Sequence, residues 1–591
     1  MLLAVVPALA MAASHTFQFK GDDFLLDGKP FQIIGGEMHP ARIPVEYWRH
    51  RIQMAKAMGC NTIAAYVFWN YQESSEGKFD FKSTNHDVAR FIKIAQEEGM
   101  WVLLRPGPYV CAEWDFGGIP PYLLRYPDLK VRCMDPRYMS AVERYLKQLA
   151  SQVKPLLVTH GGPILMVQIE NEYGSYGNDR DYVKRLKQIW ESNGIDVPFY
   201  TADGATTYML ESGALPGCAV GLDPGTGLDG YALAKRMNPG VPVFSSETYP
   251  GWLTHWGENW ARVDTEGISK ELRFLFDNHK SFNLYVVHGG TNFGFTAGAN
   301  SGGKGYEPHV TSYDYDAPIT EQGRATSKFM ALRELIAKTT GVTPPPIPEP
   351  IPAIEVSEFK LEPFSSVWAS LPAPVHYAQP RPFEEMDQYQ GFAIYRTRLI
   401  GHKSGHLTVT ELHDYATVFV DGKFVGSLDR RDGKMSIDLP RTDSKEPVLD
   451  ILVEAMGRIN FAQQMIDRKG ITDRVTLNGM TLMNWDVYNL PMIDAPTSGT
   501  LHPTPGTLRP GMFFKGSFSL GKPADTFLDC SYLKKGVVWV NGHNLGRYWE
   551  IGPQKRLYCP APWLKAGRNE VIVFDLLATE GASMRGFPTL E

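Results

Sequence analysis

Acidic residues occur within two apolar stretches of the sequence, where their burial needs an explanation. The stretch Ile164–Gly174 contains Glu170 and Glu172, and the stretch Pro242–Trp252 contains Glu247. A buried carboxylate without a partner is costly, so each must be hydrogen-bonded, protonated or used in chemistry. Two carboxyl groups about 5–5.5 Å apart are what a retaining glycosidase needs, because one attacks the anomeric carbon while the other protonates the departing oxygen and then activates water. A structural ion pair is the alternative interpretation.

The sequence carries no motif for metal-dependent hydrolysis, phosphate binding or a serine nucleophile. It contains no His-Glu-x-x-His zinc motif, no calcium-binding loop, no Gly-Lys-Ser/Thr phosphate loop and no Gly-x-Ser-x-Gly nucleophile elbow. Hydrolysis without a metal or a cofactor is therefore favoured. The net charge of −6 and the lack of a basic block argue against nucleic-acid binding. Beyond the extreme N-terminus no apolar run approaches the roughly 20 residues that cross a bilayer, so we expect no membrane span.

Aromatic residues gather near the same acidic residues. The chain has 13 Trp and 27 Tyr, and several of them lie at expected strand ends or in the loops that follow: Tyr66, Trp69, Tyr109, Trp114, Tyr249, Trp252, Trp256, Tyr313 and Tyr315. An aromatic face packs on the C–H face of a sugar, while polar groups at its edge form hydrogen bonds. Packing at a rim is the alternative for any single one. Their proximity to Glu113, Asn171, Glu172 and Glu247 favours a sugar site.

The elements that would position these residues alternate along the first part of the chain. Eight apparent strands are Gln32–His39, Asn61–Trp69, Trp101–Tyr109, Ile164–Glu172, Pro198–Asp203, Cys218–Leu222, Val241–Glu247 and Phe282–Gly289, and helical patterns between them include Glu46–Met58, Asp87–Glu98 and Tyr138–Val153. This order predicts an α/β fold, a (β/α)₈ TIM barrel over residues 20–342, with catalytic groups at the C-terminal ends of its strands. Glu172 and Glu247 are then expected to face each other across its mouth. The strand period of two predicts that Gln168, Glu170 and Glu172 share one face.

The rest of the chain is predicted to be all-β. Residues 343–355 are Pro-rich and predict a linker, followed by one β-sandwich over 356–495 and a second over 496–591. Val418–Gly426 resembles Val538–Gly546 at a spacing of 120 residues, and each carries an Asp-Gly or Asn-Gly hairpin turn. The pattern resembles the jelly-roll, galactose-binding-like modules of many glycosidases. Whether these modules bind sugar is left open.

The N-terminus and the cysteines bear on the compartment. Residues 1–13 are apolar and end in small residues, which predicts a signal peptide and an exported protein, periplasmic or extracellular. A disordered segment or a buried strand is the alternative. The six cysteines lie far apart and show no zinc spacing. Cys530 and Cys559 fall in one late domain, so a disulfide between them is one hypothesis.

At these residues the sequence resembles family 35 glycoside hydrolases, the β-galactosidases that include the lysosomal and plant enzymes. The matching stretches are Arg105–Trp114, Ile169–Gly174, Ser246–Trp252, Gly289–Phe293, Thr311–Pro318 and Val538–Trp549. The resemblance implies that Glu172 is the acid/base, that Glu247 is the nucleophile and that Asn171 holds the sugar's 2-hydroxyl. It also implies a galactose pocket with no metal, built from Tyr66, Cys111, Ala112, Glu113, Tyr249 and Tyr315, with Tyr313 nearby. Cys111 would then be a thiol of the pocket wall.

Two stretches depart from the family pattern. Family members often read Gly-Gly-Ser-x-His-Tyr where this chain has Gly35–Pro40, with Glu37 in the serine position, and Gln72 stands where histidine is usual. Neither change touches the two glutamates. The sequence therefore predicts a retaining exo-β-galactosidase that acts on terminal β-galactosyl residues. Another retaining β-glycosidase of the same superfamily and a non-catalytic carbohydrate-binding protein are the alternatives. Linkage preference and oligomeric state are left open.

Overall fold

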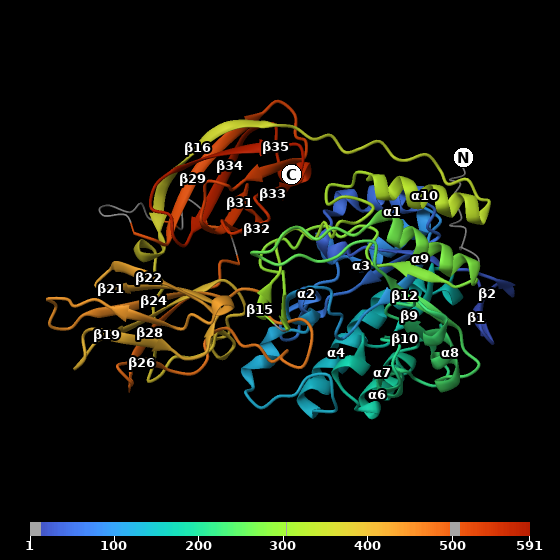
Figure 1. The fold of residues 1–591 in the computed structure, drawn as a ribbon, viewed down its shortest axis with the longest axis horizontal. Coiled ribbons are helices and arrows are strands. Elements are labelled where there is room, and N and C mark those ends of the chain that lie inside the picture. Colours follow the sequence, from blue (N-terminus) through green and yellow to red (C-terminus); the bar gives the residue numbers. More distant parts are fainter. Residues whose placement is uncertain (1–13, 303, 494, 497–500, 502–508) are drawn as a thin grey trace, which may run out of the picture.

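The computed structural model describes residues 14–302, 304–493, 495–496, 501 and 509–591, and its first large unit is a closed barrel of eight parallel strands (Figure 1). The barrel strands are β4 (Ile34–Glu37), β5 (Thr62–Tyr66), β8 (Trp101–Arg105), β9 (Ile164–Gln168), β10 (Phe199–Asp203), β11 (Ala219–Leu222), β12 (Val243–Thr248) and β13 (Phe282–Leu284). They pair in chain order and β13 closes on β4. All eight predicted strands are confirmed. The predicted signal peptide, residues 1–13, lies outside the described residues.

One longer helix follows each barrel strand, as in the predicted (β/α)₈ fold. These helices are α1 (Trp48–Met58), α3 (Val88–Glu97), α4 (Pro136–Val153), α6 (Arg180–Ser192), α7 (Thr207–Gly213), α8 (Leu228–Met237), α9 (Thr265–Asp277) and α10 (Ser327–Thr340). Six of them begin at an Asp or Thr whose side chain accepts a hydrogen bond from a backbone N–H of the first turn. Short helices α2 (Trp69–Gln72) and α5 (Tyr173–Tyr176) lie in two of the connections.

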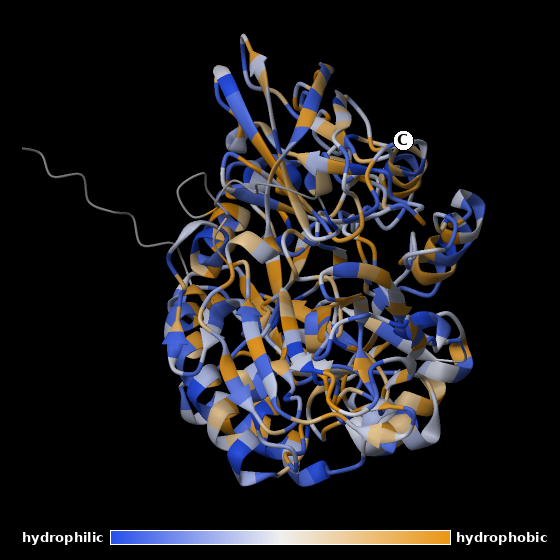
Figure 2. Cartoon of the chain, turned by 90° about the vertical axis from the view of Figure 1, so that its left-hand side faces the viewer, coloured by the Kyte–Doolittle hydropathy of each residue, from blue (hydrophilic) through white to orange (hydrophobic). Residues whose placement is uncertain are grey.

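The barrel core is apolar between the strands and the helices. Figure 2 shows hydrophobic residues concentrated in the strands at the centre and hydrophilic residues on the outer helices. Three smaller β-elements belong to the same part of the chain. One is a sheet of β1 (Phe17–Lys20), β2 (Asp23–Leu26) and β3 (Lys29–Pro30). The others are two-stranded sheets, β6 (Glu73–Ser75) with β7 (Lys78–Phe79) and β14 (Ala299–Gly302) with β15 (Gly305–Pro308). Phe24 of β2 packs edge-on against Phe244 of β12. The small sheet therefore extends the core of the barrel.

The first β-sandwich packs a six-stranded sheet on a four-stranded one around an apolar core. The larger sheet contains β17 (Val375–Tyr377), β28 (Trp485–Leu490), β18 (Phe392–Arg398), β24 (Val448–Glu454), β21 (Tyr415–Val420) and β22 (Lys423–Asp429). The smaller sheet contains β23 (Ser436–Leu439), β19 (Gly405–Val409), β26 (Val475–Leu477) and β27 (Met480–Thr481), and β20 (Leu412–His413) pairs with β25 (Gly470–Ile471).

The second β-sandwich corrects one predicted domain assignment. Its strands are β16 (Val356–Ser366), β29 (Met512–Leu520), β30 (Thr526–Asp529), β31 (Lys535–Val540), β32 (His543–Trp549), β33 (Arg556–Cys559), β34 (Gly567–Asp575) and β35 (Ala582–Phe587). Strand β16 pairs with β35 over its first half and with β29 over its second half. The predicted placement of residues 356–366 in the first sandwich is therefore wrong, because the segment after α10 runs directly to the last sandwich, where β16 lies between β29 and β35 (Figure 1).

The two repeated sequence patterns form equivalent hairpins. Asp421 and Gly422 turn between β21 and β22, and Asn541 and Gly542 turn between β31 and β32, all four with positive φ. Asp-Gly and Asn-Gly suit this turn because both central residues must be left-handed. In each sandwich the first strand of the hairpin also pairs with a late apolar strand, β24 or β34. The predicted relation between the two modules is confirmed in their strand pairing.

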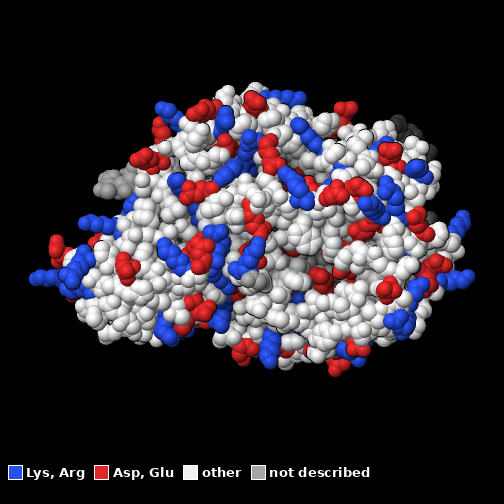
Figure 3. Space-filling view, in the orientation of Figure 1, with Lys and Arg blue, Asp and Glu red and all other residues white. Residues whose placement is uncertain are grey.

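Three further observations concern the part of the chain that the structure describes. All six cysteines, which lie among the described residues, are free thiols, so the hypothesis of a disulfide between Cys530 and Cys559 is wrong. No helix within the described ranges is long and apolar enough to cross a membrane. Figure 3 shows acidic and basic side chains interspersed over the face drawn.

Candidate active site

A small cavity opens at the C-terminal ends of the barrel strands and brings the predicted residues together. It has a volume of about 160 Å³, well below the ~300–1,000 Å³ of sites for drug-sized ligands. Nine of the ten predicted site residues line it: Tyr66, Cys111, Ala112, Glu113, Asn171, Glu172, Glu247, Tyr249 and Tyr315. The tenth, Tyr313, lies behind this wall and donates a hydrogen bond to Glu113. The cavity has room for one small polar molecule.

Glu247, on β12, is the more strongly hydrogen-bonded of the two central carboxyl groups. Its Oε1 accepts hydrogen bonds from Arg105 (2.5 Å) and from the Tyr66 hydroxyl (3.2 Å), and its Oε2 accepts one from the Tyr249 hydroxyl (3.0 Å). Burial raises the pKa of Glu247, while the positive charge of Arg105 and the hydrogen bonds from Arg105 and Tyr249 oppose that rise. Three donors aimed at one carboxyl group favour its ionised form.

Glu172 has the opposite environment. It follows the end of β9 in a left-handed conformation, and the contact with the Asn171 amide, at 3.4 Å, is long. Burial raises the pKa of Glu172 to about 8, and the nearby charges of Glu247, Asp203 and Glu113 act in the same direction against Arg132. This raised pKa favours the protonated form of Glu172 at neutral pH. The surroundings of Glu247 favour its ionised form, and those of Glu172 favour its protonated form. A nucleophile and a general acid require this difference between two carboxyl groups.

The prediction that Gln168, Glu170 and Glu172 share one face is wrong. Strand β9 ends at Gln168, and both glutamates have positive φ, so the extended alternation stops before them. Glu170 turns away from the cavity and forms a two-pronged ion pair with Arg132, with both N···O distances at 2.8 Å. Tyr182 adds a hydrogen bond at 3.1 Å. The alternative interpretation, a structural ion pair, therefore applies to Glu170.

Asn171 is held in one orientation by its neighbours. Its Oδ1 accepts hydrogen bonds from Tyr66 (2.9 Å), Arg105 (3.0 Å) and Gln168 (2.8 Å). Because all three partners donate, the amide nitrogen must lie on the opposite side, toward Glu172. The side chain therefore presents a fixed N–H donor next to the protonated carboxyl group.

The wall Cys111–Ala112–Glu113 has an unusual backbone. All three residues have positive φ, at 59°, 55° and 50°. Arg42 donates a hydrogen bond to the Ala112 carbonyl oxygen (2.5 Å), and the N–H of Gly298 donates one to the Glu113 carbonyl oxygen (2.9 Å). The contacts of neighbouring segments thus hold this wall in place.

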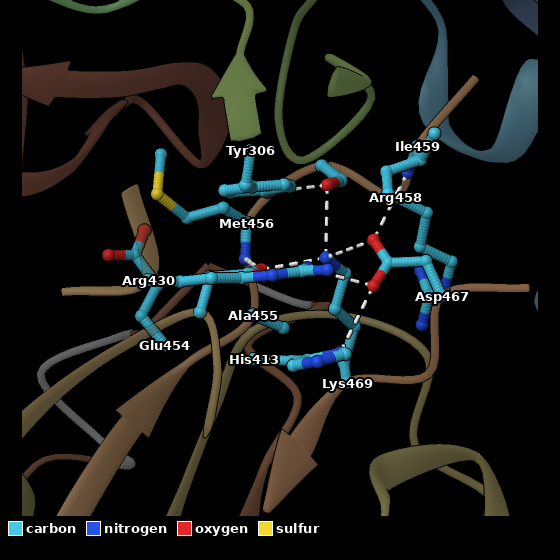
Figure 4. A network of polar contacts seen from close by, with 12 residues as sticks. Tyr306, His413, Arg430, Glu454, Ala455, Met456, Arg458, Ile459, Asp467 and Lys469 are labelled. Atoms are coloured by element: carbon cyan, nitrogen blue, oxygen red, sulfur yellow. Dashed lines mark hydrogen bonds and ion pairs between the residues drawn. The ribbon is translucent and has the colours of Figure 1, made fainter. Parts of the chain in front are cut away.

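The first β-sandwich reaches the cavity through the segment Ala455–Phe461, which follows β24. Figure 4 shows the polar network behind this segment. The buried Lys469 ammonium contacts Asp414 (2.7 Å), Asp467 (2.9 Å) and the Gly457 carbonyl oxygen (3.0 Å), and the Tyr306 hydroxyl, from the barrel hairpin strand β15, donates to the same carbonyl oxygen at 2.6 Å. The network therefore ties the sandwich to the barrel.

On the barrel side of this segment, Arg458 pairs with Asp115 at 2.9 Å, and the Tyr109 hydroxyl donates to the Asn460 carbonyl oxygen at 2.6 Å. The next residue, Phe461, lines the cavity. A residue of the sandwich is thus part of the site.

Sequence reasoning missed several residues of the site. Arg105 contacts Glu247 and is the last residue of β8, so its place at a strand end was a usable signal. Val110, Leu253, Tyr285, Asn300 and Phe461 also line the cavity. Phe461 stands 214 positions after Glu247 and carries no local pattern that points to the barrel. Trp252, noted among the aromatic residues, lines the cavity and is 48% exposed, so it stands at the opening.

Two clusters of His, Asp and Glu among the described residues have side-chain atoms close enough to share a metal ion. In the cluster His413, Asp414 and Asp467, both carboxylates are already paired with Lys469 and Arg430. The other cluster is His255, Glu258 and Glu307, and its residues are not part of the cavity wall.

The chain is similar to known proteins over nearly its whole length. Three family models match it: Glycosyl hydrolases family 35 over residues 23–339, Beta-galactosidase, first all-beta domain over 380–491, and Beta-galactosidase, galactose-binding domain over 511–569. A beta-galactosidase from Xanthomonas manihotis is 41% identical over 571 residues, which cover 94% of each chain. The beta-galactosidase of Homo sapiens is 38% identical and covers 98% of this chain and 90% of its own length. Beta-galactosidase 17 of Arabidopsis thaliana is 39% identical, with coverages of 97% and 89%.

Proposed function

The chain belongs to glycosyl hydrolases family 35, and from this premise we propose that it is a retaining exo-β-galactosidase. Glu172 and Glu247 line one small cavity, with Glu172 set to hold a proton and Glu247 set to stay ionised. That pairing carries the proposal. The relatives named beta-galactosidase support galactose as the sugar that is released. The small volume of the cavity supports the removal of single terminal units.

The proposed reaction takes place in two displacements. Glu247 attacks the anomeric carbon, the bond from that carbon to the leaving oxygen breaks, and Glu172 gives its proton to this oxygen. The galactosyl group is then held as an ester on Glu247. Water next attacks the anomeric carbon, Glu172 takes a proton from it, and the ester bond breaks to release galactose and restore the Glu247 carboxylate. Two inversions at one carbon retain the β configuration.

The surrounding residues suit these roles. Asn171 presents its amide donor beside the acid, where a 2-hydroxyl of the sugar would lie. Arg105, Tyr66 and Tyr249 hold the nucleophile and prevent it from taking the proton of its neighbour. Trp252 and Phe461 stand where the rest of the substrate would leave the cavity, and we assign them to contact with the leaving group.

The test is turnover of aryl β-galactoside, β-glucoside and β-mannoside by the purified protein. We expect the galactoside to be cleaved by far the fastest, with β-galactose as the first product seen by NMR. A glucoside or mannoside turned over as fast would favour another retaining β-glycosidase, and no turnover would favour a carbohydrate-binding protein.

Two substitutions separate the roles of the two glutamates. Glu247→Gly with azide is expected to form an α-galactosyl azide from an activated aryl β-galactoside, because azide attacks in place of Glu247 as the aryl group leaves. Glu172→Gly with azide is expected to form a β-galactosyl azide from the same substrate, because azide attacks the galactosyl ester on Glu247 and releases its carboxylate. Glu271→Gln, on α9 outside the barrel, is the control and should keep full activity. Products of the opposite configuration would reverse the assignments.

A further inference from the structure

A line of buried charged and polar side chains lies behind the cavity wall and ends at Glu247. Arg42 contacts His39 Nδ1 at 2.7 Å, and His39 Nε2 lies 3.1 Å from Glu37 Oε1. The other oxygen of Glu37 contacts Nη1 of Arg105, whose Nη2 contacts Glu247 Oε1 at 2.5 Å. Glu37, His39, Arg42 and Arg105 are all at most 1% exposed. Glu37 is therefore joined to Glu247 through one buried guanidinium.

The hydrogen-bond donors around Glu37 indicate its protonation state. A guanidinium only donates, so His39 Nδ1 accepts from Arg42, and the proton of the neutral ring is on Nε2, facing Glu37. Asn283 Nδ2 donates to Glu37 at 2.7 Å, and Arg105 donates as well. Burial raises the pKa of Glu37, but the three neighbours all present hydrogens and leave no acceptor for a carboxyl proton. The contacts therefore fit a carboxylate.

Arg105 is shared between two carboxylates. Its Nε donates to Gln168 at 2.6 Å, so the guanidinium is fixed on three sides by Glu37, Gln168 and Glu247. A guanidinium whose charge is divided between two acids stabilises each of them less than it would stabilise one alone. The negative charge of Glu37 also acts directly on Glu247 and raises its pKa.

We propose that Glu37 is a positioning residue of the active site: it holds Arg105 in the orientation that contacts Glu247 and shares that positive charge, so that Glu247 remains a stronger nucleophile. The inference rests on the proposed function of Glu247. Glu37 does not line the cavity, so it acts through Arg105.

Several titratable groups besides Glu37 surround Glu247. The titratable and charged side chains that act on it, or on which it acts, from the surrounding strands and loops are Glu37, Tyr66, Arg105, Glu113, Glu172, Tyr200, Asp223, Tyr249, Tyr285 and Tyr315. Of the carboxylates among these, only Glu37 is paired with the same guanidinium as Glu247 in the described residues. Replacing Glu37 leaves the positive charge of Arg105 to Glu247 alone and removes no residue of the cavity wall.

The experiment measures the attack by Glu247 alone. The full-length protein is inactivated with 2-deoxy-2-fluoro-β-galactosyl fluoride, a probe that needs little acid assistance, and the rate is followed from pH 4 to pH 8. In Glu37→Gln and Glu37→Ser, the acidic limb of this rate is expected to move to lower pH by about one unit, because Glu247 becomes a weaker base. The rate on the plateau is expected to fall about tenfold, while KM for an aryl galactoside changes less than about twofold.

A matched control separates this role from a general loss of packing. Glu73 is also fully buried and hydrogen-bonded, to Trp69 and Tyr122, but does not contact Arg105. Glu73→Gln is expected to lower the melting temperature without moving the acidic limb. An acidic limb that stays in place in both Glu37 variants would overturn the inference. A wild-type protein that is neither labelled nor active would instead overturn the proposed function.

Discussion

Replacing Glu172 with glutamine is expected to stabilise the folded protein at neutral pH while removing most of its activity. In the folded state the pKa of Glu172 is raised to about 8, chiefly by burial, from an ordinary value of 4.5. Between these two values the unfolded chain ionises the carboxyl group and the folded chain does not. The folded state therefore binds more protons, and the stability associated with Glu172 falls as the pH rises from about 4.5 to about 8.

The size of the effect follows from the same pKa difference. A pH of 7 is about 2.5 units above the ordinary pKa of a glutamate in the unfolded chain. At about 1.4 kcal/mol per unit, Glu172 therefore lowers the free energy of unfolding at pH 7 by about 3 kcal/mol. Glu172 borders an open cavity, so solvent screening reduces this to about 1–3 kcal/mol. A glutamine has the shape of the protonated acid and avoids the cost. Loss of the general acid is expected to lower kcat about 10²–10⁴-fold on a substrate with a poor leaving group.

The assay is thermal unfolding of the wild type and Glu172→Gln at pH 4.5 and pH 7.5. The variant is expected to melt higher at pH 7.5 and at nearly the same temperature as the wild type at pH 4.5. The contrasting variant is Glu170→Gln, which leaves the buried Arg132 unpaired and should lower the melting temperature at both pH values, by the equivalent of about 3–5 kcal/mol. An equal gain for Glu172→Gln at the two pH values would refute the reasoning, because a change of packing does not titrate.

Three further outcomes are expected. Gly251→Ala should lower kcat/KM about tenfold or more, because its Cβ would lie 1.7 Å from the carbonyl oxygen of Tyr315 and displace that cavity residue, whereas Gly227→Ala, with nothing within 4 Å, should be neutral in the same kinetic assay. Arg458→Ala should leave Asp115 buried without its partner and destabilise the protein by about 3–5 kcal/mol in chemical unfolding, and a change below about 1 kcal/mol would contradict the role given to this pair. Reducing agent should leave the melting temperature unchanged, since the six cysteines are free, and a drop would indicate a disulfide.

The barrel was predictable because its signals are local. Most of the strands are short apolar runs, and six of the eight helices after them begin at an Asp or Thr cap. Glu247 was placed correctly because β12 stays extended through Thr248, so the side chains alternate as expected. Asp-Gly and Asn-Gly located the two sandwich hairpins for a similarly local reason.

The wrong predictions concern residues whose placement depends on contacts with distant parts of the sequence. The direction of Glu170 depends on a left-handed backbone after β9 and on Arg132, which lies 38 positions earlier in the chain. The sandwich to which β16 belongs is decided by its pairing with β29 and β35, more than 140 positions later in the chain. Neither outcome is contained in the periodicity of the segment itself.

The backbone of the cavity wall explains why the barrel and the first sandwich must act together. Non-glycine residues in the left-handed region cost about 1–3 kcal/mol each, and Cys111, Ala112 and Glu113 adopt it in succession. Such a conformation persists only where contacts from elsewhere hold it. Part of that support comes from the sandwich, because Asn460 Nδ2 lies 3.4 Å from Cys111 Sγ.

The same sandwich segment also fixes the residues after the wall. The N–H of Arg458 donates to Asp115 Oδ1 at 2.7 Å, two positions beyond Glu113. These contacts add to those of Arg42 and Gly298, which hold the same wall from the barrel side. The barrel carries both glutamates, but the shape of the pocket in which they act depends on a segment more than 300 residues away in sequence from that wall. The catalytic unit is therefore the barrel together with the first sandwich.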